Sequence, residues 1–179
     1  MNYSLAGHDL LASALEGDVT AFAQMIEPLW DPAYRLACSM LGDREAAEDA
    51  VQEASLNAWR NVRRLRRDTA SLRPWFLTIV ANQCRSMRRA PWWRVLRLPN
   101  FPERTGGSGP GNDERLDLEN ALRGLTDQQR LVLVLHYYLD LPMEEVAATL
   151  GISKGAAKSR VHRAVRALRP AIETTEVKT

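Results

Sequence analysis

The residues in this sequence that are best suited to chemistry are cationic, and they are clustered. Residues 151–170 contain six lysines and arginines and no acidic residue, and residues 60–97 contain eleven arginines and one aspartate. Residues 1–59, by contrast, contain ten acidic and two basic residues. Neutralisation of phosphates by lysine and arginine supplies the sequence-independent part of nucleic-acid binding. The two basic segments therefore favour nucleic acid as a partner, and the acidic segment indicates a second partner of a different kind.

Residue types that support other chemistry are few and scattered. His8 lies near the N-terminus, His136 lies between apolar residues, and neither Cys38 nor Cys84 has a histidine nearby in the sequence. The sequence has no glycine loop of the phosphate-binding type and no spacing typical of metal ligands. We therefore predict that the protein is not an enzyme, and we expect no cofactor, no metal and no small-molecule substrate.

The composition is that of a globular protein in a reducing compartment. The chain has 179 residues, of which 45% are hydrophobic and 26% charged, enough for one ordinary domain or two small ones. Two cysteines make no disulfide framework, and the N-terminus does not have the pattern of a signal peptide. No apolar run approaches the roughly 18 residues that a membrane span needs. We expect a cytoplasmic protein without membrane insertion.

The elements that must position the charged residues are predicted to be helices, because apolar residues recur at helical spacing and strand-like alternation is weak. The fold class is therefore all-α. We predict two small helical domains, at residues 1–97 and 114–179. A flexible linker at 98–113 joins them, because proline and glycine are concentrated there.

The first domain is predicted to contain a helix that is interrupted near Pro28 and Pro32 and ends at Gly42. Asp43 can cap the next helix. One face of that helix is apolar and comprises Ala47, Ala50, Val51, Ala54, Ala58, Val62 and Leu65. The opposite face is acidic and comprises Glu45, Glu48, Asp49, Gln52 and Glu53. A further helix follows, with Pro74 in its first turn and its end before Pro91.

The second domain has the layout of a helix–turn–helix unit at residues 142–168. Thr126 and Gln129 have the spacing of a capping box for the preceding helix, at 127–139. Gly151 is expected to form the turn, and Ser153 can cap the last helix. In that helix, Ala157, Val161, Ala164, Val165 and Leu168 form an apolar stripe.

The cationic side of the last helix lies outside this stripe and could enter a DNA major groove, which admits one helix. Gly155, in the first turn, could allow close approach to a phosphate at the helix N-terminus. The alternative is a terminal helix with a solvated basic face. The preceding short helix, and Ala147 where the two helices must approach, favour DNA binding.

Three stretches carry a resemblance to a known family: "DREAAEDAVQEASLNAWRNV", "RPWFLTIVANQCRSMRR" and "LTDQQRLVLVLHYYLDLPMEEVAATLGISKGAAKSRVHRAVRALR". In this order they resemble bacterial sigma factors of the extracytoplasmic-function type, group IV of the sigma-70 family. The resemblance implies a protein that binds core RNA polymerase, recognises the −35 and −10 promoter elements and assists DNA melting. It also implies an anti-sigma factor as a partner, since many members are held inactive by one.

The resemblance assigns roles to residues of both domains. It implies that the acidic face binds core polymerase, although a solvated acidic face is the alternative. It implies that the −10 element is contacted by Arg63, Arg64, Arg66, Arg67, Asn82, Arg85, Arg88 and Arg89. It implies that the −35 element is read by Lys154, Lys158, Ser159, Arg160, His162 and Arg163. Arg160 lies nearer the packing stripe, so a structural role is possible for it.

For several residues, more than one role stays open. Asn82 could hydrogen-bond a base edge or cap a neighbouring loop. Burial is favoured over base stacking for Trp75 and Phe76, and packing over contact for Trp59. The family often has aspartate where this chain has Ser86, and Trp92 and Trp93 have no assigned role. A stand-alone helix–turn–helix regulator is the rival function, but it leaves the acidic helix and the second basic segment unexplained.

Overall fold

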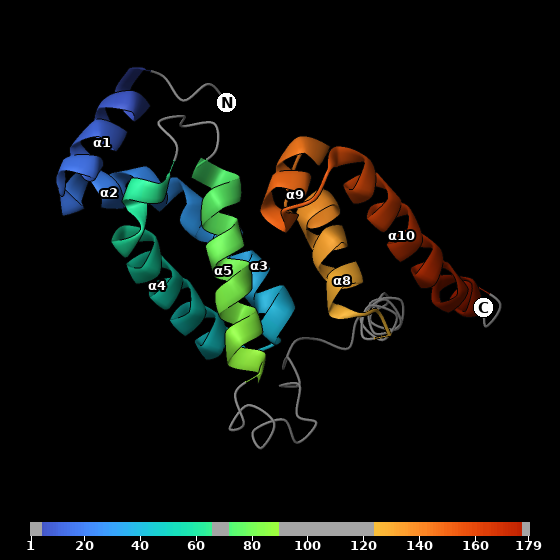
Figure 1. Cartoon of the computed structure of the whole chain (residues 1–179). Helices are drawn as coiled ribbons and strands as arrows, with labels where there is room; N and C mark the ends of the chain where they lie inside the picture. The colour runs from blue at the N-terminus through green and yellow to red at the C-terminus, as the bar shows by residue number, and fades with distance from the viewer. Residues whose placement is uncertain (1–4, 66–71, 90–123, 177–179) are drawn as a thin grey trace. The chain divides into compact units, whose positions relative to one another are not determined.

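The computed structural model describes residues 5–65, 72–89 and 124–176. Every regular element in these ranges is helical, which confirms the predicted all-α class (Figure 1). The chain divides into two compact units, residues 1–99 and 100–179. The linker predicted at 98–113 lies outside the described residues, so its boundaries remain a prediction. Trp92 and Trp93 also lie outside them.

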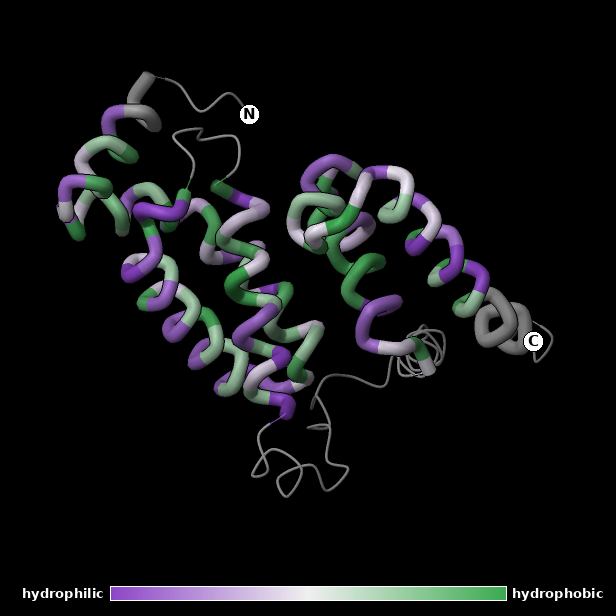
Figure 2. Tube along the Cα trace, in the orientation of Figure 1, coloured by the Kyte–Doolittle hydropathy of each residue, from purple (hydrophilic) through white to green (hydrophobic). Residues whose placement is uncertain are grey.

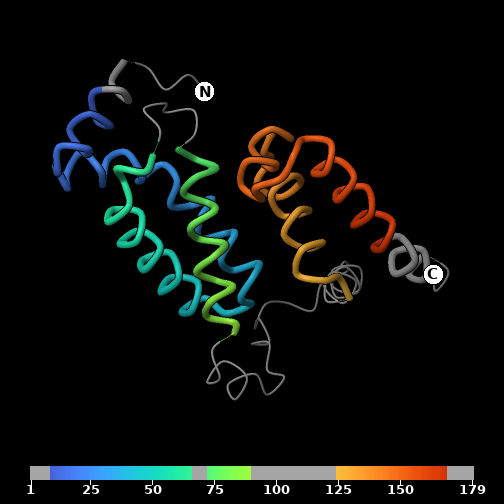
Figure 3. Tube along the Cα trace, in the orientation of Figure 1, coloured from blue at the N-terminus to red at the C-terminus, as the bar shows by residue number. Residues whose placement is uncertain are grey.

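The first unit is built from five α-helices and two short 3₁₀ turns within the described residues. Figures 1 and 3 show their order along the chain: α1 (Leu5–Glu16), α2 (Val19–Ile26), η1 (Glu27–Leu29), α3 (Trp30–Leu41), α4 (Arg44–Arg60), η2 (Val62–Arg64) and α5 (Leu72–Arg89). Helices α3, α4 and α5 pack against one another, and α1 packs against α2. The packing of α3–α5 fixes where the acidic and arginine-rich surfaces of this unit lie.

Local signals set the helix ends of this unit as predicted. The chain is interrupted at η1, which begins next to Pro28, whereas Pro32 lies in the first turn of α3. Gly42 ends α3 in the left-handed conformation, with φ of 71°. The Asp43 carboxylate then accepts a hydrogen bond from the Ala46 backbone N–H at 2.7 Å and so caps α4.

The core of the first unit confirms the predicted faces of α4. Its buried residues are all small, and most are fully inaccessible: Ala46, Ala47, Ala50, Val51, Ala54 and Ala58. Leu36 of α3 and Phe76 of α5 are also fully buried. Hydrophilic and hydrophobic bands alternate along α4 in Figure 2, as a half-buried helix requires.

The second unit contains α8 (Asp127–Leu133), a π-helical turn η4 (Val134–Tyr138), α9 (Met143–Leu150) and α10 (Lys154–Glu176). Helix α10 packs against both α8 and α9. The predicted capping box is present, since Gln129 N–H donates to Thr126 Oγ1 at 3.3 Å and Thr126 N–H donates to Gln129 Oε1 at 2.9 Å.

The α-helix predicted at 127–139 was wrong beyond Leu133, because the chain widens into η4 there. Around this turn Leu135 and Leu139 are buried, while Tyr137 and Tyr138 are exposed. His136 Nδ1 lies 3.1 Å from the carbonyl oxygen of Leu141, which ties the end of η4 to the start of the next segment. Because π-helical turns are rare and short, the helical spacing of the sequence did not predict one here.

Candidate functional site

Helices α9 and α10 form the predicted helix–turn–helix unit. Gly151 ends α9 in the left-handed conformation, with φ of 64°, and the Ile152 N–H donates to the carbonyl of Ala147 at 3.0 Å. Ser153 Oγ accepts a hydrogen bond from the Ala156 N–H at 3.2 Å and so caps α10. Ala147 is buried, as expected where two helices approach closely. The turn, the cap and the small residue are therefore all confirmed.

The side chains of α10 are sorted by face as the sequence predicted. Ala157, Val161 and Ala164 are buried, and Val165 and Leu168 are half-buried. The predicted −35 residues lie on the other side, and five of them are exposed: Lys154, Lys158, Ser159, His162 and Arg163. The sixth, Arg160, is half-buried, in keeping with its place near the stripe. A cationic surface is thus held on one side of a well-packed helix.

One residue at this surface was not predicted. The Lys154 ammonium, at the start of α10, donates a hydrogen bond to the carboxylate of Glu144, in the first turn of α9. This hydrogen bond lowers the pKa of Glu144, and the charge of Lys158 makes a smaller contribution in the same direction. Glu144 therefore places a negative charge beside two lysines of the cationic surface. The pair joins residues ten apart, so helical spacing alone could not reveal it.

Arg163 lies in the middle of the exposed side of α10. Its Nε donates to the carbonyl of Ser159, one turn earlier, at 3.3 Å. This bond holds the start of the guanidinium close to the helix while the side chain remains exposed. An arginine held in this way can present its planar fork to a base edge or a phosphate.

The predicted −10 residues of the first unit lie on two elements. Arg63 and Arg64 are exposed on η2, directly after α4, and Arg66 and Arg67 lie outside the described residues. The remaining four lie along α5, where Asn82 and Arg89 are exposed and Arg85 and Arg88 are half-buried.

Asn82 has a partner that neither open reading anticipated. Its Oδ1 accepts a hydrogen bond from Arg85 Nη1 at 2.7 Å, across one turn of α5. The carbonyl end of the amide is therefore oriented toward Arg85. With that orientation, the Nδ2 end is the part of Asn82 suited to donate to an approaching base.

The aromatic side chains of α4 and α5 mostly pack against other parts of the first unit. Phe76 is fully buried, and the rings of Phe22 and Trp59 pack together with centroids 5.2 Å apart. Both observations confirm the predicted packing roles. Trp75 is half-buried, so only part of its ring lies in the core.

The acidic face of α4 is exposed along its whole length. All five predicted residues are on the solvent side: Glu45, Glu48, Asp49, Gln52 and Glu53. Two further exposed residues continue the same side toward the end of the helix. Leu56 is 49% exposed, and Arg60 is the last residue of α4. The helical period that puts the acidic residues on the solvent side also puts Leu56 there, but Leu56 was not among the predicted residues.

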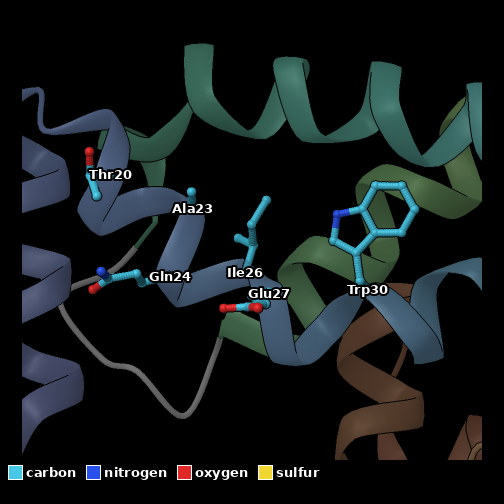
Figure 4. Close-up of a pocket in the computed structure, with 6 residues that line it drawn as sticks. All are labelled: Thr20, Ala23, Gln24, Ile26, Glu27 and Trp30. Atoms are coloured by element: carbon cyan, nitrogen blue, oxygen red, sulfur yellow. The ribbon is translucent and has the colours of Figure 1, made fainter.

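A shallow hollow of about 320 Å³ lies on the surface of the first unit, between α2 and the start of α3 (Figure 4). Its lining is mainly apolar and comprises Thr20, Ala23, Gln24, Ile26, Glu27 and Trp30. Glu27 is the one ionisable residue in this lining, so the hollow lacks the paired groups that acid–base or nucleophilic catalysis requires.

Metal-binding clusters and membrane-spanning helices are both absent from the residues that the structure describes. Among those residues, no group of three or more histidine, cysteine, aspartate or glutamate side chains is arranged to hold a metal ion. None of the helices in the described ranges combines the length and apolar character that crossing a membrane requires.

Comparison with known proteins identifies the family of this chain. Residues 25–94 match the family described as Sigma-70 region 2, and residues 115–168 match Sigma-70, region 4. The chain is also 31% identical to the ECF RNA polymerase sigma factor SigL of Mycobacterium tuberculosis, over 87% of this chain and 93% of SigL. This protein belongs to the extracytoplasmic-function sigma factors.

Solved structures place this sigma factor in the same structural group. The sigma factor RpoE of Bartonella quintana, solved with the anti-sigma factor NepR, has a TM-score of 0.65 and 25% identity, over 87% of this chain and 98% of that one. CnrH, solved with the cytosolic domain of CnrY, shares the fold, with a TM-score of 0.70 and 24% identity over 94% of this chain and 98% of that one.

As a sigma factor, the protein directs promoter-specific transcription. The family is one of transcription initiation factors. The rival reading, a stand-alone helix–turn–helix regulator, is not supported, because such a regulator would not carry the region 2 match.

Proposed function

We propose that this sigma factor divides its work among three surfaces. The acidic face of α4 docks on core RNA polymerase. The basic residues of η2 and α5 contact and help to melt the −10 element. The exposed side of α10 reads the −35 element in the major groove.

The observation that carries the proposal is that the two sides of α10 differ in burial and in charge. Its stripe of small residues is packed into the second unit, while Lys158, His162 and Arg163 are exposed on the other side. A helix of this kind can enter the major groove without disturbing its own core. A merely solvated helix would not need a preceding short helix joined through a glycine turn.

The surfaces of the first unit support the other two roles. The acidic residues of α4 suit a basic partner surface, where charge complementarity raises the association rate and the specificity of docking. Opening DNA requires unstacking a base, at a cost of a few kcal/mol. The exposed arginines of η2 and α5 can offset that cost through phosphate contacts.

Three further expectations belong to this proposal. The relatives solved with NepR and CnrY support an anti-sigma factor as a partner of this chain as well. We assign no enzymatic activity to the protein, because its roles are binding and DNA deformation. We place it in the cytoplasm, where core polymerase and promoter DNA are found.

Run-off transcription with purified core polymerase tests the proposal. Templates from a genomic library are transcribed with core polymerase alone and with core polymerase plus this protein. We expect discrete transcripts that depend on the protein. If no promoter-specific transcript rises above the level of core polymerase alone, the proposal is wrong.

A further inference from the structure

The exposed face of α4 contains one apolar side chain in an otherwise polar surface. Leu56 is 49% exposed. It follows Gln52 by four residues and Asp49 by seven, so the helical period puts all three on one side of α4. Single exposed leucines are common on protein surfaces. The position of this one, one turn after Gln52 at the C-terminal end of the acidic face, distinguishes it.

The rest of α4 shows that Leu56 is not part of the core of the unit. Every buried residue of this helix is alanine or valine, and these residues form the opposite face. Leu56 is the largest apolar side chain of α4 apart from Trp59, which packs against Phe22. The packing of the unit therefore does not account for the exposed half of Leu56.

The polar residues around Leu56 define a patch with a clear boundary. Glu48, Asp49 and Glu53 lie on its N-terminal side, and Arg60 lies one turn beyond it. The exposed residues that follow, Arg63 and Arg64, are also cationic. The acidic character of the surface thus ends at Leu56, which stands between an acidic segment and a basic one.

Interfaces are commonly organised as an apolar anchor surrounded by polar residues that exclude water. We propose that Leu56 is the apolar anchor of the polymerase-docking surface, and that it inserts into an apolar pocket of a basic surface on core polymerase. The proposal rests on the docking role proposed above for the acidic face. It adds that charge alone does not hold the complex, and that the contact which resists salt is made by Leu56.

The test measures the affinity of the full chain for core polymerase, by fluorescence anisotropy of N-terminally labelled protein at several salt concentrations. Leu56→Ala and Leu56→Gln remove the anchor while keeping a good helix former. Glu48→Gln and Glu53→Gln remove charge from the same face. Val19→Ala is the matched control, because Val19 is 60% exposed and lies on α2. Circular dichroism confirms that each variant is folded.

We expect both Leu56 variants to weaken binding by about tenfold or more, a typical loss for an interface anchor. The slope of log Kd against log salt should stay as in the wild type for these variants. It should fall for the two glutamate variants, because they remove charge, and Val19→Ala should bind as the wild type does.

Three results would overturn the anchor. If Leu56→Ala binds within about twofold of the wild type while the glutamate variants weaken binding, the face docks by charge alone. If Val19→Ala loses as much affinity as Leu56→Ala, the effect is not specific to this face. If neither the leucine nor the glutamate variants weaken binding, the proposed docking role of α4 fails as well.

Discussion

Lys154 and Glu144 form an ion pair that joins the start of α10 to the first turn of α9. The pair links the two helices of the helix–turn–helix unit at the edge of its cationic surface. Both side chains are exposed, so the pair contributes little to overall stability. Its importance is that it holds the Lys154 ammonium beside Glu144, at the edge of the cationic surface.

The first prediction concerns the titration of Glu144, whose pKa in the folded protein lies below its ordinary value of 4.5 because Lys154 donates a hydrogen bond to it. A depressed pKa means that the stabilisation is present above the unfolded-state pKa and is lost as pH falls through the folded-state pKa. We expect Lys154→Met to raise the pKa of Glu144 toward 4.5. A carboxyl-carbon NMR titration measures this. Lys158→Met should raise the pKa less, and an unchanged pKa in Lys154→Met would contradict the pairing.

The second prediction concerns Arg163, which is exposed in the middle of the cationic side of α10. We expect Arg163→Ala to weaken initiation from −35-dependent promoters while leaving the affinity for core polymerase unchanged. If Arg163 contacts a phosphate, the salt slope of promoter binding falls by about one. Arg35→Ala is the charge-matched control, since Arg35 pairs with Asp31 at 3.0 Å in the first unit. An equal loss of polymerase binding in Arg163→Ala would count against the assigned role.

The third prediction concerns Gly155, in the first turn of α10. A Cβ at this position would meet no other atom within 4 Å, so the folded protein accommodates alanine. We expect Gly155→Ala to raise the free energy of unfolding by up to about 1 kcal/mol. We also expect −35-dependent initiation to fall, because the new methyl group blocks the approach of a phosphate to the helix N-terminus. Thermal unfolding and run-off transcription measure the two effects, and initiation at the wild-type level would rule out that approach.

The fourth prediction concerns the two cysteines. Burial raises the pKa of Cys84 to about 12, so its thiol is both neutral and inaccessible near neutral pH. Cys38 is only half-buried. We expect iodoacetamide to modify Cys38 in the native protein and to reach Cys84 only after unfolding. Mass spectrometry of the alkylated protein measures both rates, and equal native rates would show that the core around Cys84 opens readily.

Features of the structure that depend on neighbouring residues could be read from the sequence. The caps at Asp43 and Ser153, the left-handed glycines and the two faces of α4 were all predicted, because each follows from spacing within one or two helical turns. The same reasoning placed Lys158 and Arg163 on the exposed side of α10. The roles of these residues in binding remain predictions.

Features that depend on tertiary packing could not be read in this way. The π turn at η4 is one such feature: Leu135 and Leu139 are four residues apart and would share a face in a regular helix as well, so their spacing does not reveal the change of pitch. The Lys154–Glu144 pair depends on the angle between α9 and α10. The Asn82–Arg85 bond is local to α5, but spacing alone does not choose between competing rotamers. Each of these changes the description of a candidate site without changing the fold.

The small buried residues of α4 have a mechanical consequence. Since none is larger than valine, α4 lies close to the helices that it packs against, α3 and α5. A close contact between stiff helices behaves as a fixed spacer between the outer face of α4 and the outer face of α5. On the proposed function, the distance from the polymerase to the opened DNA is then set by this spacing. A bulkier residue at Ala54, which is fully buried, would strain this close contact and lower the stability of the first unit by about 1–3 kcal/mol.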